Sequence, residues 1–374
     1  MKHDSDILIL GAGIAGASLG YALGSRASVL MLEAEDQPGY HSTGRSAAHF
    51  IEGYGPPGVR ALSRASAPFF KNPPSDFAQY PLLESRGVMT LFRPGQEREL
   101  ETVYKQMKSE GIPVLRLSEE EARHHLPVLP QGRFVEALLD PTGFDMDVHA
   151  IHQGYLRGFK QAGGKLVTQA RAHSIKRIDG GWQVADEKGR QWIAQTLVNA
   201  AGAWADQIAQ MAGLQPLNLQ PKRRSAWTFH PPSGLDIRHW PLVLSSEENW
   251  YIKPDAGVLL GSPANADPVE PQDVQPEIED IAAGIERIES DLSLPVGRPI
   301  RTWAGLRTFS PHGEMVGGYD PHEPNFFWVV GQGGYGIQTS SAMGRACANL
   351  LLREPLDNDL VLCGVNADVL KPVR

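Results

Sequence analysis

Three glycines near the start of the chain have the spacing of a phosphate-binding loop. An apolar run, residues 7–10, leads into Gly11, Gly13 and Gly16. Gly11 makes the tight turn after a strand, Gly13 lets backbone amides approach a pyrophosphate, and Gly16 lets a helix pack on the strand. The unpaired N–H groups and the positive dipole end of that helix would stabilise the anion. The pattern predicts a strand, a turn and a helix that bind a dinucleotide.

A carboxylate supports the same prediction. A second apolar run, residues 28–32, ends at Glu33, about 20 residues after the glycines. At this spacing an acidic side chain bonds the ribose hydroxyls of a dinucleotide that lacks a 2′-phosphate. A glycine-rich turn in an unrelated α/β protein is the alternative, but strand, glycines, helix and carboxylate occur here in register. These residues alone fit NAD and FAD equally well.

Residues 41–49 narrow the choice of cofactor, because they are mostly small or hydroxylated. Small side chains let backbone amides approach a planar ring, and serine or threonine hydroxyls can bond the polar edge of that ring. Ser42 or Thr43 could instead cap an ordinary helix, and both roles can hold at once.

Two later segments repeat the order of strand, loop and helix. Residues 196–198 lead into the loop 199–204, and residues 326–330 lead into the glycine-rich loop 331–338. Loops at the carboxyl edge of one parallel sheet can meet around one cofactor. A helix N-terminus there would stabilise negative charge on a reduced flavin ring. The sequence therefore predicts an α/β fold with a Rossmann-like flavin site, although the last loop could also serve packing alone.

The segment 216–311 differs from the rest in composition and pattern. It contains many prolines, and residues 224–229, 250–253 and 257–261 have the alternating pattern of strands. A helix is expected at residues 277–291. These features predict a second domain built on an antiparallel sheet, which makes the whole chain α+β. With 374 residues the chain is long enough for two domains with a cofactor buried between them.

Charge and cysteine content exclude several classes of function. The net charge is −8 and the only basic cluster is residues 222–224, so no nucleic-acid partner is expected and the substrate should be small. Cys347 and Cys363 are too few for a disulfide framework and lack C-x-x-C spacing. We therefore expect a reducing compartment and no structural zinc.

Neither a metal site nor a membrane span is expected. Residues 118–121 predict a helix capping box, and His149 with His152 lacks a third ligand. No apolar signal region begins the chain, and no apolar run is long enough to span a bilayer. The expected location is the cytoplasm, with contact to the inner face of the membrane left open.

Five motifs carry a family likeness: Gly11-x-Gly13-x-x-Gly16 with Glu33, and residues 42–48, 199–204, 303–307 and 331–338. Together they resemble the D-amino-acid oxidase family of FAD enzymes over nearly the whole chain. Within that family the sequence is most similar to the bacterial FAD-dependent D-arginine dehydrogenases. The resemblance implies an FAD domain made of residues 1–50, 140–216 and 312–374, and a substrate domain made of residues 51–139 and 217–311.

The resemblance also implies which residues bind FAD. They are Gly11, Gly13, Ile14, Ala15, Gly16, Glu33, Ala34, Ser42, Thr43, Gly44, Arg45, Ser46, Ala47, Ala48, Ala201, Gly202, Trp204, Gly333, Gly334, Tyr335, Gly336, Ile337 and Gln338. No cysteine lies near Arg307, where some amine-oxidising relatives attach the flavin, so a non-covalent cofactor is expected.

The implied catalytic residues surround an amino acid. Arg224 and Arg307 would hold its carboxylate through bidentate hydrogen bonds. Tyr54 and Tyr251 would close over the substrate. His49 and Gln338 would bond around the amine and the flavin, and the carbonyl of Gly334 would accept from the amine. Purely structural roles are the alternative: Arg224 could lie on a solvated basic face, Tyr251 could belong to the core, and His49 could cap a helix.

The implied reaction is oxidative deamination of a D-amino acid. A hydride leaves Cα for flavin N5, and the resulting imine hydrolyses to a 2-oxo acid and ammonia. Positioning supplies most of the catalysis, and His49, a tyrosine-linked water or solvent would accept the ammonium proton. The electron acceptor is expected to be a quinone or another unidentified species, and the protein a monomer or a homodimer.

One position departs from the D-arginine dehydrogenases. They have an acidic residue, which meets the substrate guanidinium, where this chain has Val88. An unpaired buried guanidinium is unfavourable, so we expect weaker use of D-arginine and D-lysine and a shift toward apolar or smaller side chains. Glu84 could partly compensate if it shares a regular strand with Val88.

Two other functions remain open at this point. The same site could belong to an oxidase of secondary amines or glycine-like substrates that uses oxygen. A non-catalytic FAD-fold binding protein is the remote alternative, which the paired arginines and the complete flavin loops argue against.

Overall fold

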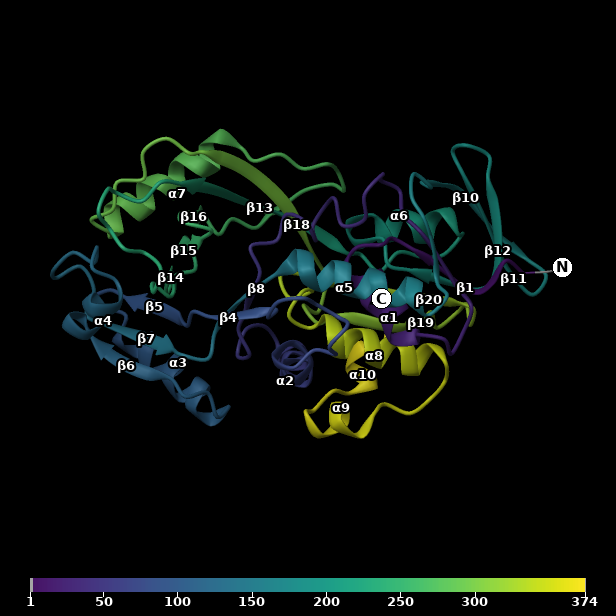
Figure 1. Cartoon of the computed structure of the whole chain (residues 1–374), viewed down its shortest axis with the longest axis horizontal. Coiled ribbons are helices and arrows are strands. Elements are labelled where there is room, and N and C mark those ends of the chain that lie inside the picture. The colour runs from purple at the N-terminus through teal and green to yellow at the C-terminus, as the bar shows by residue number, and fades with distance from the viewer. Residues whose placement is uncertain (1–2, 374) are drawn as a thin grey trace.

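The computed structural model describes residues 3–373. Two large sheets lie along the longest axis of the molecule (Figure 1). An eight-stranded sheet, which carries the N-terminal strand, lies to the right, and a nine-stranded sheet lies to the left. A small three-stranded sheet lies between them.

The eight-stranded sheet has a parallel centre. Its parallel strands are β1 (Ser5–Leu10), β2 (Val29–Leu32), β9 (Lys165–Val167), β12 (Gln191–Asn199) and β20 (Phe326–Val330). Antiparallel strands β10 (Ala172–Ile178), β11 (Gly181–Asp186) and β19 (Val316–Tyr319) complete it. Ile7 and Ile9 face one core and Leu8 and Leu10 the other, which explains why β1 is apolar throughout.

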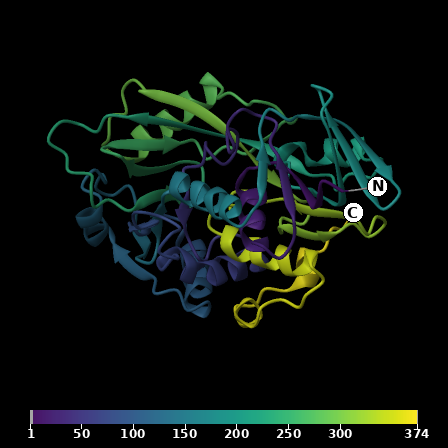
Figure 2. The same ribbon diagram turned by 45° about the vertical axis from the view of Figure 1, so that its right-hand side comes forward.

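Helices cover this sheet and bring the ends of the chain together. Helix α1 (Ile14–Leu23) packs between α5 (Val148–Gln161) and α8 (Ser340–Leu351). Figure 2 shows the first and last segments, purple and yellow, side by side. The remaining helices here are η1 (Gly202–Trp204), α6 (Ala205–Met211), α9 (Asn358–Leu362) and α10 (Ala367–Leu370).

The nine-stranded sheet is built from two separate stretches of chain. Its strands are β5 (Val88–Phe92), β6 (Leu115–Ser118), β7 (Glu136–Asp140), β13 (Gln220–Phe229), β14 (Leu242–Ser245), β15 (Tyr251–Asp255), β16 (Val258–Ser262), β17 (Asp267–Pro268) and β18 (Arg301–Phe309). All neighbours are antiparallel except β5 and β14, which join the two stretches. The expected antiparallel sheet is therefore mixed at this junction.

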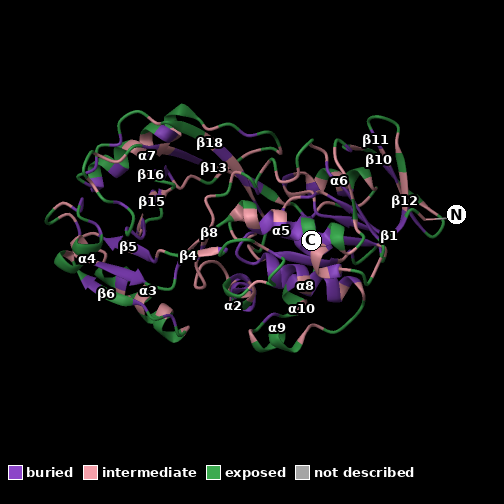
Figure 3. Ribbon diagram, viewed as in Figure 1, coloured by how far each residue is buried: buried purple, intermediate pink, exposed green. Residues whose placement is uncertain are grey.

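Helices α3 (Glu97–Ser109), α4 (Glu119–His125) and α7 (Ile278–Asp291) belong to the same part of the molecule. Figure 3 shows that most strands are buried, whereas α3 and α9 carry exposed residues. The small sheet consists of β3 (His49–Phe50), β8 (Phe144–Met146) and β4 (Leu83–Ser85), and α2 (Pro57–Lys71) lies near it.

Several sequence expectations can be compared directly with these elements. The capping box is confirmed, with Ser118 and Glu121 bonding each other's backbone N–H. The last long helix begins at Ser340, directly after the glycine-rich loop 331–338, as predicted. Within residues 3–373, no group of three or more His, Cys, Asp or Glu side chains could hold a metal ion, and no helix is long and apolar enough to cross a membrane. The domain boundaries remain a prediction.

Candidate functional site

The glycine turn after β1 leaves no room for side chains. Gly11 has φ +102°, and a Cβ on it would lie 2.5 Å from the carbonyl oxygen of Ala200. A Cβ on Gly16 would lie 2.0 Å from the carbonyl oxygen of Gly11. Both positions therefore require glycine, and helix α1 begins directly after Gly13.

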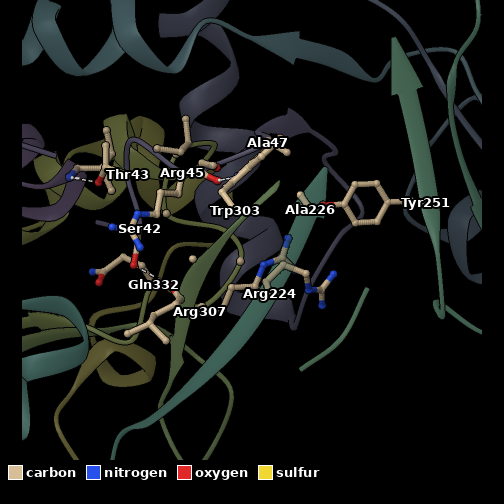
Figure 4. A pocket seen from close by; sticks show the side chains of 18 residues that line it. Ser42, Thr43, Arg45, Ala47, Arg224, Ala226, Tyr251, Trp303, Arg307 and Gln332 are labelled. Atoms are coloured by element: carbon tan, nitrogen blue, oxygen red, sulfur yellow. Dashed lines mark hydrogen bonds between the residues drawn. The ribbon is translucent and has the colours of Figure 1, made fainter. Parts of the chain in front are cut away.

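Three side chains hold this turn in place. The Glu33 carboxylate accepts a hydrogen bond from the Ala12 N–H (2.9 Å), and the Thr43 hydroxyl accepts one from the Ile14 N–H (3.0 Å; Figure 4). His152 Nε2 lies 2.8 Å from the Ala12 carbonyl oxygen, and burial lowers the pKa of His152. Thr43 thus caps α1, the helix of the glycine motif, from a segment distant in sequence.

Three cavities run from this turn to the nine-stranded sheet. The first has a volume of about 370 Å³ and is lined by Glu33 and Trp204 among others. A second of about 100 Å³ shares Ser42 and Thr43 with it. The third, of about 580 Å³, shares Ala47 with the second and is hereafter the substrate cavity. Because neighbouring cavities share lining residues, they form one elongated path.

Most of the expected cofactor residues line this path. They are Gly11, Gly13, Ile14, Ala15, Glu33, Ala34, Ser42, Thr43, Arg45, Ser46, Ala47, Ala48, Ala201, Gly202, Trp204, Gly333, Gly334, Tyr335, Gly336, Ile337 and Gln338. Gly16 and Gly44 do not line it. Both are needed for close packing, since a Cβ on Gly44 would lie 2.6 Å from the Gly39 carbonyl oxygen.

Two arginines meet on one face of the pair β13–β18. Arg224 lies opposite Gly305, and Arg307 is two residues further along β18, so both side chains point to the same side (Figure 4). Arg223, on the opposite face, is paired with Glu277 (2.6 Å). The alternative of Arg224 on a solvated basic face is therefore wrong.

The arginine pair lacks an ion-paired carboxylate among the described residues, although Glu248, which lines the same cavity, acts on Arg224. Burial, with repulsion from Arg307, lowers the pKa of Arg224, and its Nε is buried without a hydrogen-bond partner. No carboxylate of residues 3–373 forms an ion pair with either arginine. Two adjacent guanidinium groups that no carboxylate pairs with directly suit a planar anion such as a substrate carboxylate.

Aromatic and glycine residues complete the substrate cavity. Tyr54 and Tyr251 both line it, and the ring of Tyr54 packs edge-on against Tyr335 with centroids 5.2 Å apart. Burial raises the pKa of Tyr335 to about 12, so its hydroxyl stays protonated. A Cβ on Gly334 would lie 2.9 Å from Arg307 Nη1, so a side chain there would displace the guanidinium from its present position.

Gln338 borders the substrate cavity, but its amide is engaged by the protein. Its Oε1 accepts from the Ile51 N–H (3.1 Å), and its Nε2 donates to the Ile51 carbonyl (3.2 Å) and to the Ser63 hydroxyl (2.8 Å). These bonds use both amide hydrogens. Gln338 therefore fixes the segment that carries His49 and Tyr54 instead of donating to substrate.

His49 belongs to a buried network that the sequence did not reveal. His49 Nδ1 lies 3.1 Å from Asp145 Oδ1, across the pair β3–β8. Asp145 also pairs with Lys253 (2.7 Å) and with Arg86. Burial lowers the pKa of His49, so the ring is neutral near pH 7, and its Nε2 has no hydrogen-bond partner. His49 is thus a buried, neutral proton acceptor that borders the substrate cavity.

Val88 lines the substrate cavity as expected, but Glu84 does not. Glu84 lies on β4 with its side chain 77% exposed, 3.7 Å from Arg86. Gly87 has φ +72°, which separates β4 from β5. The condition of one regular strand is not met, so the expectation that Glu84 compensates for Val88 is wrong.

A family model described as DAO, FAD dependent oxidoreductase, matches residues 6–350. The chain belongs to this family. FAD-dependent oxidoreductase domain-containing protein 1 of Bos taurus is 24% identical over 409 residues, covering 93% of this chain and 81% of the relative. Glycine oxidase from Geobacillus kaustophilus has a similar structure, with a TM-score of 0.84 and 21% identity over 100% of this chain and 99% of that one. L-proline dehydrogenase from P. horikoshii has a TM-score of 0.81 and 20% identity over 94% of both chains.

FAD is therefore the cofactor of this FAD-dependent oxidoreductase, and the residues along the path fit it. The glycine turn with the α1 N-terminus suits a pyrophosphate, and Glu33 lies beside that turn. Gln332 Nε2 and His41 Nδ1 are buried without hydrogen-bond partners, and both residues line the first cavity. Unpaired buried polar atoms in such a place are explained by a polar ligand.

The side chain of Arg45 bonds protein groups in this FAD-dependent oxidoreductase, and its expected part in FAD binding remains a prediction. Its guanidinium donates to the carbonyl groups of Val274 (3.0 Å) and Ala304 (3.2 Å) and pairs with Asp273. The Trp303 indole donates to the Arg45 carbonyl (3.1 Å). The side chain of Arg45 therefore fixes the flavin-binding segment to the nine-stranded sheet.

Sequence reasoning missed several residues at this site. Gln332 lies inside the glycine-rich loop, where its spacing alone could have identified it. Asp145 and Lys253 could not be found in this way, because sheet pairing brings them to His49 from distant parts of the chain. Arg171 lines the first cavity because β9 pairs with β2.

We expect the His49 network to make this oxidoreductase sensitive to acid. Because burial lowers the pKa of His49 from its ordinary value of 6.5, the unfolded chain takes up a proton before the folded chain does. The free energy of unfolding should therefore fall as the pH drops below 6.5, by up to about 1.4 kcal/mol per pH unit. Denaturant titration from pH 7.5 to 5 should give a shallower pH dependence for His49→Gln than for wild type.

Exposed His124 provides the control, since His124→Gln should keep the wild-type slope. Titration of Asp145 affects the free energy of unfolding in a lower pH range. Burial alone would raise its pKa, but His49 and Lys253 lower it below its ordinary value of 3.8, so its contribution is lost only in stronger acid. Identical slopes for wild type and His49→Gln above pH 5 would contradict the assignment.

Proposed function

We propose that this chain catalyses FAD-dependent oxidative deamination of D-amino acids, giving a 2-oxo acid and ammonia. The observation that carries the proposal is the unpaired arginine couple, Arg224 and Arg307, in a cavity continuous with the FAD path. The expected roles of these residues follow the resemblance to the D-arginine dehydrogenases, which also suggests the D configuration.

The residues of this chain would act mainly by positioning. Arg224 and Arg307 bind the substrate carboxylate and thereby fix the direction of the Cα–H bond. Tyr54 and Tyr251 cover the substrate and exclude water. Neutral His49 accepts a proton from the substrate ammonium, directly or through water. FAD supplies the hydride acceptor, and water then hydrolyses the imine to the 2-oxo acid.

The cofactor is proposed to be held without a covalent bond. Cys347 is buried within α8, where burial raises the pKa of its thiol, and neither Cys347 nor Cys363 lines the three cavities. The proposed electron acceptor is a quinone or a similar carrier. A cytoplasmic location and a monomeric or homodimeric state are proposed on the sequence alone.

A second candidate is oxidation of secondary or glycine-like amines with oxygen as acceptor. The similarity to glycine oxidase and L-proline dehydrogenase favours it. The same arginine pair would bind the carboxylate of such substrates. A binding protein without catalysis is the remote alternative, and it predicts that no small amine reduces the flavin.

Anaerobic mixing separates these functions. The holoenzyme is mixed with D-amino acids, L-amino acids, glycine, sarcosine and proline while flavin absorbance is followed. Bleaching by several D-amino acids, with slower or no bleaching by the others, is expected. Bleaching by N-methylated substrates alone would favour the second candidate, and peroxide release in air would identify oxygen as acceptor. Absence of bleaching by every compound would refute both functions.

A further inference from the structure

One wall of the substrate cavity is the inner face of three adjacent strands, β14, β5 and β7. Residues directly opposite each other in neighbouring strands point to the same face. Val88 pairs with Asp140 on one side and with Leu242 on the other. The residues of these strands that line the cavity are Val88, Thr90, Leu138, Asp140, Leu242 and Leu244. This wall is therefore apolar except for Thr90 and Asp140.

Asp140 is a buried carboxylate with one unused oxygen. Its residue is 2% exposed. Oδ1 accepts two hydrogen bonds from Thr142, one from the backbone N–H (2.8 Å) and one from the hydroxyl (2.6 Å). Oδ2 is buried and has no hydrogen-bond partner in the described chain. An unpaired buried carboxylate oxygen is unfavourable by itself, so it points to a ligand group in the cavity.

The cationic side chains near the cavity do not pair with Asp140. Arg60 pairs with Glu110 (3.3 Å) and bonds the Gly55 carbonyl (2.7 Å). Lys253 is bound to Asp145. Arg224 and Arg307 line the same cavity as Asp140, but the Oδ2 atom of Asp140 has no partner among the described residues. The cavity thus has a cationic end at the arginines, near which the exposed Glu248 also lies, and one buried carboxyl group with a free oxygen, Asp140, on another strand.

The shape of the free acceptor selects among cations. A guanidinium forms its strongest contact through two parallel N–H bonds to both oxygens of a carboxylate. In Asp140 the two Thr142 bonds already occupy Oδ1, so only Oδ2 remains. A compact ammonium group needs only one such acceptor.

We propose that Asp140 determines substrate specificity by binding an ammonium group at the end of the substrate side chain. Amino acids of the lysine and ornithine type are then the preferred class, ahead of arginine and of apolar side chains of equal length. This inference rests on the proposed function for its α-carboxylate site. It replaces the expectation, drawn from Val88 alone, that D-lysine is a poor substrate.

Binding of a non-reacting ligand tests this inference independently of turnover. 6-Aminohexanoate has a carboxylate and a terminal ammonium but no α-amine, and hexanoate lacks the ammonium. Calorimetry with the holoenzyme should show that 6-aminohexanoate binds about 10- to 100-fold more tightly than hexanoate. The Asp140→Asn variant keeps the acceptor for Thr142 and should bind both ligands almost equally. If the wild-type protein binds 6-aminohexanoate and hexanoate equally tightly, the inference is wrong.

Kinetics with substrates of matched length provide a second test of the role of Asp140. Asp140→Asn should lower kcat/KM for D-lysine about 10- to 100-fold, mainly through KM, and leave D-norleucine within about twofold. Glu84→Gln, an exposed carboxylate outside the cavity, should change neither. Adding Val88→Asp to Asp140→Asn returns a carboxylate to the same face and should restore part of the D-lysine preference. A wild-type preference for D-arginine over D-lysine would contradict the single-acceptor argument.

The two proposals fail in different ways. If 6-aminohexanoate is preferred but no amino acid bleaches the flavin, the deamination is wrong while the ammonium site stands. If D-amino acids bleach the flavin but D-norleucine and D-lysine are used equally by wild type and Asp140→Asn, the reaction stands and the role of Asp140 is wrong.

Discussion

Replacing Arg307 with methionine is expected to lower kcat/KM for the best amino-acid substrate by about 10³-fold, because two charge-assisted hydrogen bonds to the carboxylate are lost. Arg307→Lys keeps the charge but loses the bidentate geometry, so a loss of about 10- to 100-fold is expected. Steady-state kinetics should show that both variants raise KM and lower kcat, since the clamp also orients Cα.

Arg301→Met is the matched control, because Arg301 lies on the same strand but is exposed and does not line the cavities. Its kcat/KM should stay within about twofold of wild type, as for other surface substitutions. The ligand-free Arg307→Met protein should be no less stable than wild type, since repulsion with buried Arg224 is relieved. Unchanged kinetics in Arg307→Met would refute the carboxylate clamp.

Replacing Gly16 with alanine is expected to abolish FAD binding. The new Cβ would lie 2.0 Å from the carbonyl oxygen of Gly11, and this backbone atom cannot move without opening the turn after β1. Overpacking against backbone should cost about 3 kcal/mol of unfolding free energy, the upper end of the usual range. The ratio of flavin to protein absorbance in the purified variant, with thermal unfolding, measures both effects.

Gly20→Ala in the same helix separates this clash from a general effect of alanine. A Cβ on Gly20 would meet only the side chains of Met31 and Phe159, both at 2.9 Å. Side chains can shift more readily than backbone, so this variant should retain FAD. Full flavin content in Gly16→Ala would show that the turn is more adaptable than its geometry implies.

The parts of the site that sequence reasoning found are those encoded by local spacing. The glycines, Glu33 and the capping box each depend on residues within one strand–turn–helix unit or one helix turn. Arg224 was identified among its basic neighbours only through the family resemblance, and the register of β13 with β18 then showed which face it occupies. The functional roles at these positions remain proposals.

The residues that were missed are brought together by pairing between distant strands. Asp140 meets Val88, and Asp145 meets His49, only because of the register of β5 with β7 and of β3 with β8. Glu84 was misplaced because a single left-handed glycine, Gly87, changes the direction of the chain. The polar side chains of Arg45 and Gln338 hold separate parts of the protein together, which their spacing did not indicate, and their expected roles toward ligands remain predictions. Such choices depend on tertiary contacts that no spacing rule contains.

The order of strands in the parallel sheet also constrains biosynthesis. Strand β1 comes first in the chain, whereas β20 (Phe326–Val330), which pairs with β12 on the far side from β1, and the glycine loop after β20 are made near the end. The FAD path therefore cannot be complete while the ribosome is still making the first 300 residues. Such distant contacts form slowly and leave apolar strands exposed meanwhile. The supply of FAD should consequently influence how much of the newly made chain reaches the native state.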